Sequence, residues 1–346
     1  MNTSKKSAYA AAGVDIDEMM QGLKTIKNDI KKTNTDGVCS QIGSFGGLFQ
    51  SPGRDHVLVA STDGVGTKLA VATAAGIHHT VGQDLVNHCT NDILVQGAKP
   101  LFFLDYLGTA KLSARVFAQV VKGLCKACRE NGCALLGGET AEMPGLYPAG
   151  EYDLVGTIVG TVAKRKVITG ESIRPGDIII GLPSSGLHTN GYSLARKIIF
   201  KTAKLKLDDY LPGTKQKIGT ILLAVHRSYL KPVTSILDAG IPVQGMAHIT
   251  GGGLIDNVPR VLPAACRAVI DTTTWRVPPV YTYMQNTGKV DQEEMFRVFN
   301  MGIGYTIIVR PAHLDQTLST LATQRAGARV IGYIDQRQKQ PAVNLL

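Results

Sequence analysis

The feature that most constrains the fold is a repeated local pattern, in which a short apolar run ends in a glycine-rich turn that opens a helix. The first example is the apolar run Val57–Ala60, which breaks into a turn containing Gly64 and Gly66. Short apolar, β-branched runs are typical of buried strands, and glycines let backbone N–H groups approach a ligand. Because strands and helices alternate along the chain, we expect an α/β protein of the mixed α+β type.

The length of 346 residues exceeds that of one ordinary core and predicts two domains. The polar, turn-rich segment Thr169–Asp177 is the expected boundary, which gives domains of residues 1–168 and 169–346. We expect strands at 56–61, 101–106, 133–136, 153–163, 178–182, 243–248, 267–270, 303–309 and 329–334. We expect helices at 18–32, 83–97, 113–131, 191–203, 221–239, 254–261 and 313–325.

The net charge of +10 is better explained by small, multiply anionic substrates than by nucleic acid, because the aromatic fraction is only 6% and no long Lys/Arg run occurs. No apolar run has the length of a membrane span, and the N-terminus leads into no hydrophobic signal segment. We therefore expect a cytoplasmic protein that binds neither nucleic acid nor membrane. Cys125 and Cys128 form a CxxC pair, but they follow a helical apolar stripe and have no second ligand pair, so reduced structural cysteines are expected.

The turn Ser61–Leu69 combines a carboxylate, two glycines and a lysine, and it is interpreted as a loop for a metal-bound nucleotide. It lacks the P-loop spacing, and a plain connection is the alternative. In the next predicted helix, polar side chains share one face and could ligate Mg²⁺ or contact a ribose, unless they form a solvated face. These side chains are Asp84, Asn87, Asn91 and Asp92.

The run Leu135–Gly145 predicts a strand that ends in two glycines and is followed by Glu139 and Glu142. Sites in α/β folds lie at strand ends, so carboxylates from three separate elements are expected to assemble an Mg²⁺ site for ATP. The three are Asp63, Asp92 and Glu139.

Three further glycine-containing loops have the composition of anion sites, at Gly43–Gly47, Pro183–Ser193 and Ile249–Leu254. The first is equally consistent with a simple turn. The second contains His188, whose place in an anion-binding turn favours phosphate contact or proton transfer over a structural role. Several separate phosphate cradles imply two phosphorylated ligands, a nucleotide and a substrate.

The motifs together resemble the aminoimidazole ribonucleotide synthetases, or phosphoribosylformylglycinamidine cyclo-ligases, the ring-closing enzymes of purine synthesis. The resemblance covers essentially the whole chain. Its motifs are Ala12–Asp17, Thr62–Leu69, Val95–Tyr106, Gly137–Gly145, Ser184–Leu194, Thr250–Gly253, Asn257–Arg260 and Phe299–Gly304.

The resemblance implies a homodimer whose N-terminal sheets join into a barrel, a C-terminal domain resembling an α/β sandwich, and an active site in the cleft between the domains. It implies formylglycinamidine ribonucleotide as substrate, with ATP and Mg²⁺. The positions expected at the nucleotide are Lys27, Gly46, Thr62, Asp63, Gly64, Asn91, Asp92 and Glu139, of which Asp63, Asp92 and Glu139 would hold the metal. Those expected at the substrate are Ser184, Ser185, Gly186, His188, Asn190, Thr250, Gly251, Gly252 and Gly253.

Ring closure requires activation of a formamide oxygen, which we expect to receive the γ-phosphoryl group of ATP before the amidine nitrogen attacks. The residues expected at the chemistry are Asp63, Lys68 and His188. Lys68 would offset developing charge, or would instead pair with Glu139 or Glu142.

Two positions depart from the family pattern. The arm Ala8–Ala10 lacks the hydroxyl and the cation that are usual in the family, which puts phosphate binding by this arm in doubt. Thr189 replaces a usual serine. The alternatives are selenophosphate synthetase, thiamine-phosphate kinase, the preceding amidotransferase of purine synthesis, and a nucleotide-binding regulatory subunit without turnover. No cysteine lies within Gly43–Gly47 for selenium chemistry, although Cys39 is near, and the chain is too short for a fused amidotransferase.

Overall fold

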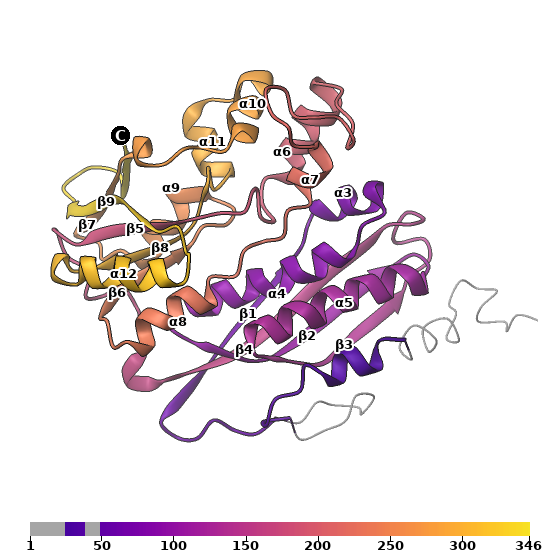
Figure 1. Cartoon of the computed structure of the whole chain (residues 1–346), viewed down its shortest axis with the longest axis horizontal. Helices are drawn as coiled ribbons and strands as arrows, with labels where there is room; N and C mark the ends of the chain where they lie inside the picture. The colour runs from indigo at the N-terminus through magenta and orange to yellow at the C-terminus, as the bar shows by residue number, and fades with distance from the viewer. Residues whose placement is uncertain (1–24, 39–48) are drawn as a thin grey trace, which may run out of the picture.

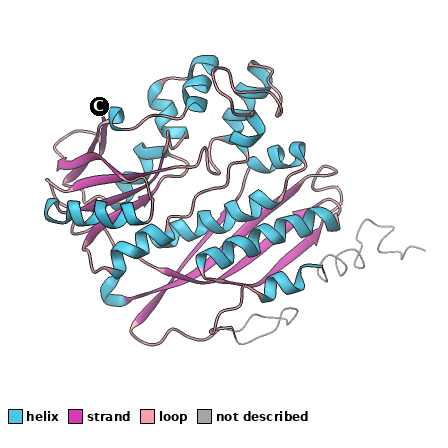
Figure 2. Ribbon diagram, in the orientation of Figure 1, coloured by secondary structure: helices cyan, strands magenta, loops and turns pink. Residues whose placement is uncertain are grey.

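The mixed α/β class is confirmed by a computed structural model that describes residues 25–38 and 49–346. Two sheets, one from each half of the chain, lie in separate layers with helices packed against them (Figures 1 and 2). The first sheet has the order β1-β4-β2-β3, with β2 parallel to β3 and β4 antiparallel to both of its neighbours. Its strands are β1 (His56–Gly64), β2 (Lys99–Thr109), β3 (Ala134–Glu142) and β4 (Tyr152–Ala163).

Two long helices cover one face of this first sheet, as Figure 1 shows. The helices of this half are α3 (Lys68–Ala75), α4 (His79–Leu94), α5 (Ala114–Asn131) and the short η1 (Lys164–Lys166), and residues 25–31 are also helical. Most of α4 is buried, because it lies between the sheet, α5 and the second half of the chain. A helix in this position can present polar side chains to the other half only if they find partners there.

Helix α5 follows its sequence pattern closely. The side chain of Ser113 caps its first turn, Phe117 and Leu124 lie on its buried face, and Gly132 ends it in the left-handed region at φ 66°. Cys125 and Cys128 lie on the same buried face. All five cysteines within the described residues are buried and unbridged, which confirms the prediction of reduced structural cysteines for those five.

The second sheet has the order β10-β7-β9-β5-β8-β6, and its strand β8, which lies between β5 and β6, is buried at every residue. Its strands are β5 (Ile178–Pro183), β6 (Val243–His248), β7 (Cys266–Ile270), β8 (Ile303–Val309), β9 (Arg329–Gln336) and β10 (Val343–Leu345). Its helices are α6 (Tyr192–Arg196), the π-helix η2 (Lys197–Thr202), α7 (Ile218–Leu222), α8 (Leu230–Asp238), α9 (Gly253–Asn257), η3 (Val258–Val261), η4 (Thr272–Thr274), α10 (Pro279–Gly288), α11 (Gln292–Val298), η5 (Pro311–His313) and α12 (Leu314–Thr323). The strands of the two sheets fall on either side of residue 168, while the division into two domains stays a prediction.

Strands β1 and β3 continue beyond the points where the sequence pattern predicts turns. Strand β1 extends to Gly64, and β3 passes through Gly137 and Gly138 to Glu142. Glycine is required within β3, because a Cβ at Gly138 would lie 2.3 Å from the carboxylate of Asp105 on the neighbouring strand. The expectation that Glu139 follows the end of a strand is therefore wrong.

The single helix predicted at 221–239 is also wrong, because residues 223–229 interrupt it between α7 and α8. Backbone groups of this interrupting loop bind side chains of α4, and those tertiary hydrogen bonds override a continuous apolar pattern. The sequence pattern also missed α3, α10, α11 and β10. Predicted helix 83–97 begins four residues earlier, at His79, and ends at Leu94.

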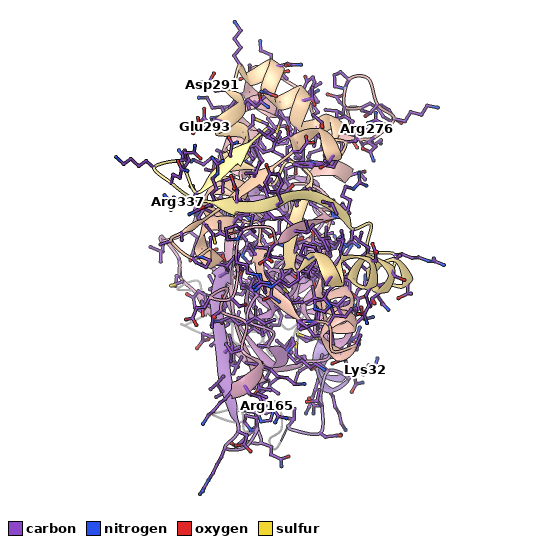
Figure 3. All side chains as sticks on the ribbon, turned by 90° about the vertical axis from the view of Figure 1, so that its left-hand side faces the viewer. Lys32, Arg165, Arg276, Asp291, Glu293 and Arg337 are labelled. Carbon is purple, nitrogen blue, oxygen red and sulfur yellow. The ribbon has the colours of Figure 1, made fainter. Side chains whose placement is uncertain are left out.

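Charged side chains of both signs project from the molecule, among them Lys32 and Arg165 at one end and Asp291 and Glu293 at the other (Figure 3). Among the described residues, no helix combines the length and the apolarity that crossing a membrane requires.

The crossing of α4 and α5 provides a test of the fold. A Cβ at Gly123 would lie 2.2 Å from the carbonyl oxygen of His79, so Gly123→Ala should lower the free energy of unfolding by about 1–3 kcal/mol despite its better helix propensity. Urea denaturation followed by circular dichroism measures this change. The neighbouring exposed position provides the control, since Lys122→Ala should change stability by no more than about 0.5 kcal/mol. A Gly123→Ala variant as stable as the parent would contradict the close crossing.

Candidate active site

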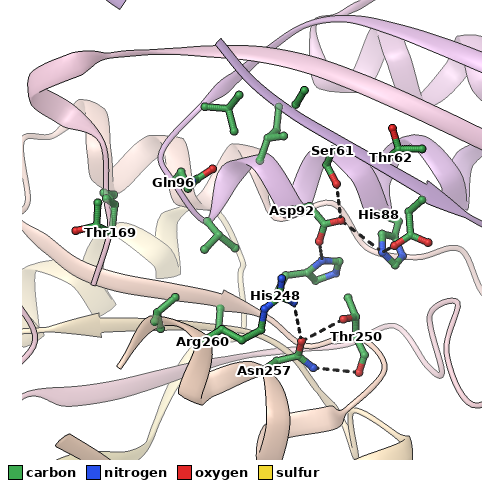
Figure 4. A pocket seen from close by; sticks show the side chains of 18 residues that line it. Ser61, Thr62, His88, Asp92, Gln96, Thr169, His248, Thr250, Asn257 and Arg260 are labelled. Atoms are coloured by element: carbon green, nitrogen blue, oxygen red, sulfur yellow. Dashed lines mark hydrogen bonds and ion pairs between the residues drawn. The ribbon is translucent and has the colours of Figure 1, made fainter. Parts of the chain in front are cut away.

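A cavity of about 550 Å³ lies between the two halves of the chain (Figure 4). The first half contributes residues of β1 and α4, and the second half contributes the end of β6 and the helices that follow it. The polar side chains that line it are Ser61, Thr62, Asp63, His88, Asp92, Gln96, Thr169, His248, Thr250, Asn257 and Arg260. A cleft with converging polar groups from two domains is the usual form of a ligand site.

Two carboxylates line this cavity, one from β1 and one from α4. Asp92 accepts hydrogen bonds from Ser61 Oγ at 3.1 Å and His248 Nδ1 at 2.8 Å. Asp63 accepts from the backbone N–H of Gly64 at 2.6 Å and has Oδ2 at 2.7 Å from His88 Nε2. Burial raises the pKa of both carboxyl groups, but His88 at Asp63 and His248 at Asp92 outweigh it, so both pKa values lie below the ordinary value. Both groups are therefore ionised at neutral pH.

Four buried imidazoles connect these carboxylates to the second half of the chain. They belong to His88 on α4, His188 after β5, His226 in the loop 223–229 and His248 at the end of β6. The rings of His188 and His226 stack with centroids 3.9 Å apart. Burial lowers the pKa values of His188, His226 and His248. Burial also disfavours charge on His88, but Asp63 and Asp92 raise its pKa above the ordinary value.

Lys68 lies outside the cavity, in a buried ion pair with Asp84. The two charged groups are 2.8 Å apart, and both side chains are 0% exposed. Lys68 Nζ also donates to the carbonyl oxygens of His188 at 3.1 Å and Ala224 at 2.7 Å. Burial lowers the pKa of Lys68 and raises that of Asp84, while the attraction between the two groups opposes both shifts. The predicted pairing of Lys68 with Glu139 or Glu142 is therefore wrong.

The polar face of α4 is not a solvated face, because most of it holds the loop 223–229, while contact of Asn91 with the nucleotide stays a prediction. Asn87 donates to the carbonyl oxygen of His226 at 2.7 Å. Asn91 donates to the carbonyl oxygen of Arg227 at 2.8 Å and accepts from the N–H of Tyr229 at 2.9 Å. The loop's backbone groups thus find their hydrogen-bond partners in the first half of the chain.

The structure separates Glu139 from the other two predicted metal ligands. Glu139 pairs with Tyr106, Tyr106 pairs with Val155, and Val155 pairs with Gly64. Three steps between neighbouring strands span about 14 Å, which is too far for one ion to join Glu139 and Asp63 within a chain. The expectation of three carboxylates on one ion is wrong for the single chain.

Of the remaining positions predicted at the nucleotide, only some lie at the cavity. Thr62 lines the cavity and its hydroxyl is 2.7 Å from that of Thr157. Lys27 is exposed on the helix of residues 25–31, away from the residues that line the cavity. Gly46 and the arm Ala8–Ala10 lie outside the described residues.

The two predicted substrate loops lie side by side, since a Cβ at Gly251 would be 3.3 Å from Asn190 Oδ1. In the first loop, Ser184, Ser185 and Gly186 form hydrogen bonds with other residues of the chain. Ser184 donates to Asn300, Ser185 donates to the carbonyl oxygen of Val225, and Tyr281 and Asn300 both donate to the carbonyl oxygen of Gly186.

His188 is fully buried with a backbone φ of 59°. Neither His188 nor Lys68 lines the cavity, so a direct catalytic role for either one stays a prediction that this geometry does not support.

The second loop contributes Thr250 to the cavity, and its three glycines form the turn behind it. Asn257 donates to the carbonyl oxygens of Gly251 and Gly253, and Gly252 has a φ of 102°. Arg260 donates to Asn257 and reaches the cavity beside Thr250 (Figure 4). The cavity therefore also has a cationic group, contributed by the second half of the chain.

Sequence reasoning missed three imidazoles, those of His88, His226 and His248. Asp84, His88 and Asp92 are spaced by four residues, which places them on one helix face, so the signal for His88 was present. His226 carried no signal, because its segment resembles a helix.

The chain matches the N-terminal domain of AIR synthase related proteins over residues 46–162 and the C-terminal domain of the same proteins over residues 174–343. Its fold is that of a thiamine-monophosphate kinase from Stenotrophomonas maltophilia K279a, with a TM-score of 0.70, 16% identity, and coverage of 94% of this chain and 95% of that one. The hydrogenase maturation protein HypE in complex with ATP has the same fold, with a TM-score of 0.66, 18% identity, and coverage of 99% and 92%.

Curated relatives are much closer in sequence. The phosphoribosylformylglycinamidine cyclo-ligase of Geotalea daltonii is 50% identical over 329 residues, covering 94% of each chain. That of Alkaliphilus oremlandii is 46% identical over 338 residues, covering 97% of this chain and 99% of the relative. Within the AIR synthase related proteins, the chain belongs to the phosphoribosylformylglycinamidine cyclo-ligase family. The resemblance inferred from the motifs is confirmed.

Breaking the buried ion pair provides a test of the domain interface. Lys68→Met should lower the free energy of unfolding by about 3–5 kcal/mol, because it leaves the Asp84 carboxylate buried without a cation. Denaturant titration followed by circular dichroism measures the loss. The exposed pair of Lys99 and Asp238 is the matched control, and Lys99→Met should cost no more than about 1 kcal/mol. Equal losses in the two variants would show that the Lys68 pair is not buried in solution.

Proposed function

We propose that this chain catalyses the ATP-dependent closure of formylglycinamidine ribonucleotide to 5-aminoimidazole ribonucleotide, with release of ADP and phosphate. The assignment to a carbon–nitrogen ligase of purine biosynthesis follows from family membership across nearly the whole length of the relatives. The observation that supports it in the structure is the cavity between the halves, with two carboxylates from the first half and Arg260 from the second. A metal-bound nucleotide and a phosphorylated substrate require these opposite charges.

The chemistry proceeds in two parts. The formamide oxygen attacks the γ-phosphorus of ATP, and the bond from that phosphorus to the bridging oxygen of ADP breaks. The amidine nitrogen then forms a bond to the formyl carbon, the carbon–oxygen bond breaks, and the oxygen departs as part of phosphate. Nucleophile and electrophile belong to one molecule, so the protein's main task is to hold the substrate in an attack geometry.

The carboxylates of Asp63 and Asp92 would hold Mg²⁺. Both are ionised oxygen donors from different elements and both face the cavity, which fits a hard cation. When bound there, Mg²⁺ would offset negative charge on the phosphates of the nucleotide. Thr250 and Arg260 are placed to contact a phosphate of either ligand, and a role for Glu139 and Lys27 at the nucleotide stays a prediction.

A homodimer is part of this proposal, and the first sheet supports it. Its face opposite α4 and α5 carries a row of uncharged side chains that are half-buried or exposed in the single chain. Leu58 is 59% exposed, Leu104 is 36% exposed, and Val159 lies between their strands. An apolar sheet face exposed to water is unfavourable, and the matching sheet of a second chain would bury it.

Turnover assays test the activity directly. The purified chain should release ADP only when formylglycinamidine ribonucleotide and Mg-ATP are both present, and Asp63→Asn should lower kcat by about tenfold or more because it removes an ionised group from the cavity. Asp55 precedes β1 and is exposed, so Asp55→Asn is the matched control and should leave turnover unchanged. ADP release that does not depend on formylglycinamidine ribonucleotide would contradict the cyclo-ligase activity. Absence of any ADP release would favour a nucleotide-binding subunit without turnover.

Sedimentation tests the dimer. Leu58→Glu should shift the protein from dimer to monomer, because a charge would be buried in the proposed contact. The control is Leu146→Glu, since Leu146 is 69% exposed outside the strands of that sheet and its change should leave the dimer intact. A parent protein that sediments as a monomer at micromolar concentration would contradict the proposal.

A further inference from the structure

The side-chain amide of Asn257 holds together the loop that follows β6, and the residue is only 3% exposed. Its Nδ2 donates to the carbonyl oxygens of Gly253 at 2.8 Å and Gly251 at 3.2 Å. Its Oδ1 accepts from Thr250 Oγ1 at 3.2 Å and from Arg260 Nη1 at 3.3 Å (Figure 4). The buried amide therefore finds partners for both its nitrogen and its oxygen within the protein.

The carbonyl oxygens of the loop fix the orientation of this amide. Turning it by half a rotation would bring Oδ1 towards the carbonyl oxygens of Gly251 and Gly253, and oxygen atoms that all carry partial negative charge repel one another. Oδ1 therefore faces the Thr250 hydroxyl. Because an amide oxygen only accepts, Thr250 donates its single hydroxyl proton to Asn257.

This bond decides what Thr250 can do in the cavity that it lines. Its hydroxyl oxygen keeps only lone pairs for a ligand, and lone pairs accept from an O–H or N–H group but repel a phosphate oxygen. Arg260 has the opposite character, because a guanidinium has five N–H donors and Arg260 gives one of them to Asn257. Of the two groups placed near a phosphate, only Arg260 can therefore donate to it.

Thr250 and Arg260 bind the same oxygen atom, so a hydrogen-bond acceptor and a cation lie next to each other at the cavity. A ligand that matches them carries a phosphate close to an O–H or N–H donor. In a ribose 5-phosphate group, the ring hydroxyls are donors within a few bonds of the phosphate. The amidine and formamide groups that ring closure joins lie on the far side of the sugar ring, so a ribose hydroxyl is the donor that fits Thr250.

We propose that Thr250 is a specificity-determining residue that accepts a hydrogen bond from a ribose hydroxyl of the ligand whose phosphate Arg260 binds. The inference rests on the proposed function, which gives the cavity a phosphorylated ribose, and it states which part of that ligand each residue recognises. The cavity then selects a ribonucleotide over its deoxy form, because a ligand without the hydroxyl leaves the Thr250 oxygen without a donor.

Binding calorimetry with the full-length protein tests this selection without any turnover. The probes are formylglycinamidine ribonucleotide and the same compound without its 2′-hydroxyl or without its 3′-hydroxyl. The parent should bind one of the two deoxy compounds about tenfold more weakly than the ribonucleotide, because one hydrogen bond is lost. Thr250→Val should bind that deoxy compound and the ribonucleotide equally well. Thr250→Ser, which keeps the hydroxyl, is the matched control and should discriminate as the parent does.

The measurement on the parent keeps the proposal falsifiable even if Thr250→Val fails to fold. Equal affinity of the parent for all three compounds would overturn the proposal. A Thr250→Val variant that still discriminates, with the same loss of affinity for every compound, would also overturn it and would indicate that Thr250 donates to the phosphate. Normal ring closure by a parent that does not discriminate would leave the proposed function intact. Discrimination that depends on Thr250, in a protein that never releases ADP, would refute the function and support the site.

Discussion

The buried ion pair of Lys68 and Asp84 is the interaction on which the rest of the molecule depends. Its cation binds two carbonyl oxygens from the second half of the chain, and Asp84 accepts the backbone N–H of His226. Two opposite charges at 0% exposure stabilise each other, and both groups have further hydrogen-bond partners. The pair thereby links the helices α3 and α4 to the backbone of His188, Ala224 and His226 in the second half of the chain.

The polar face of α4 extends this contact along the helix and sets the geometry of the candidate site. Asn87 and Asn91 hold the loop 223–229, while His88 and Asp92, from the same helix, reach the cavity. One helix therefore both contacts the second half of the chain and contributes Asp92 to the cavity. A site built on a buried helix between two bodies is more precisely placed than one built on loops alone, which suits a reaction whose main demand is the orientation of a folded substrate.

Much of the fold and part of the site could be predicted from local pattern. The stripe of α5, its capping serine and its terminal glycine lie within twenty residues of one another, and the structure follows them. Asp63 and Asp92, which line the cavity, could be predicted as candidates because carboxylates beside glycine turns and on apolar helices are unusual. The imidazole of His226 could not, because its segment has the apolar spacing of a helix, and only contacts with α4 keep it extended.

The sequence alone determined the family, the α/β class, most of the strands and the choice of the two carboxylates as candidates, because each of these is encoded in residues close together along the chain. The tertiary structure decided the partners. In the folded chain, Lys68 pairs with Asp84 and not with Glu139 or a group in the cavity. Glu139 lies three strands away from Asp63, and four histidines that are distant in the sequence lie together. The physical reason is that a buried charge or hydrogen-bonding group takes whichever partner the packing of two domains brings within reach, and that choice leaves no local pattern in the sequence.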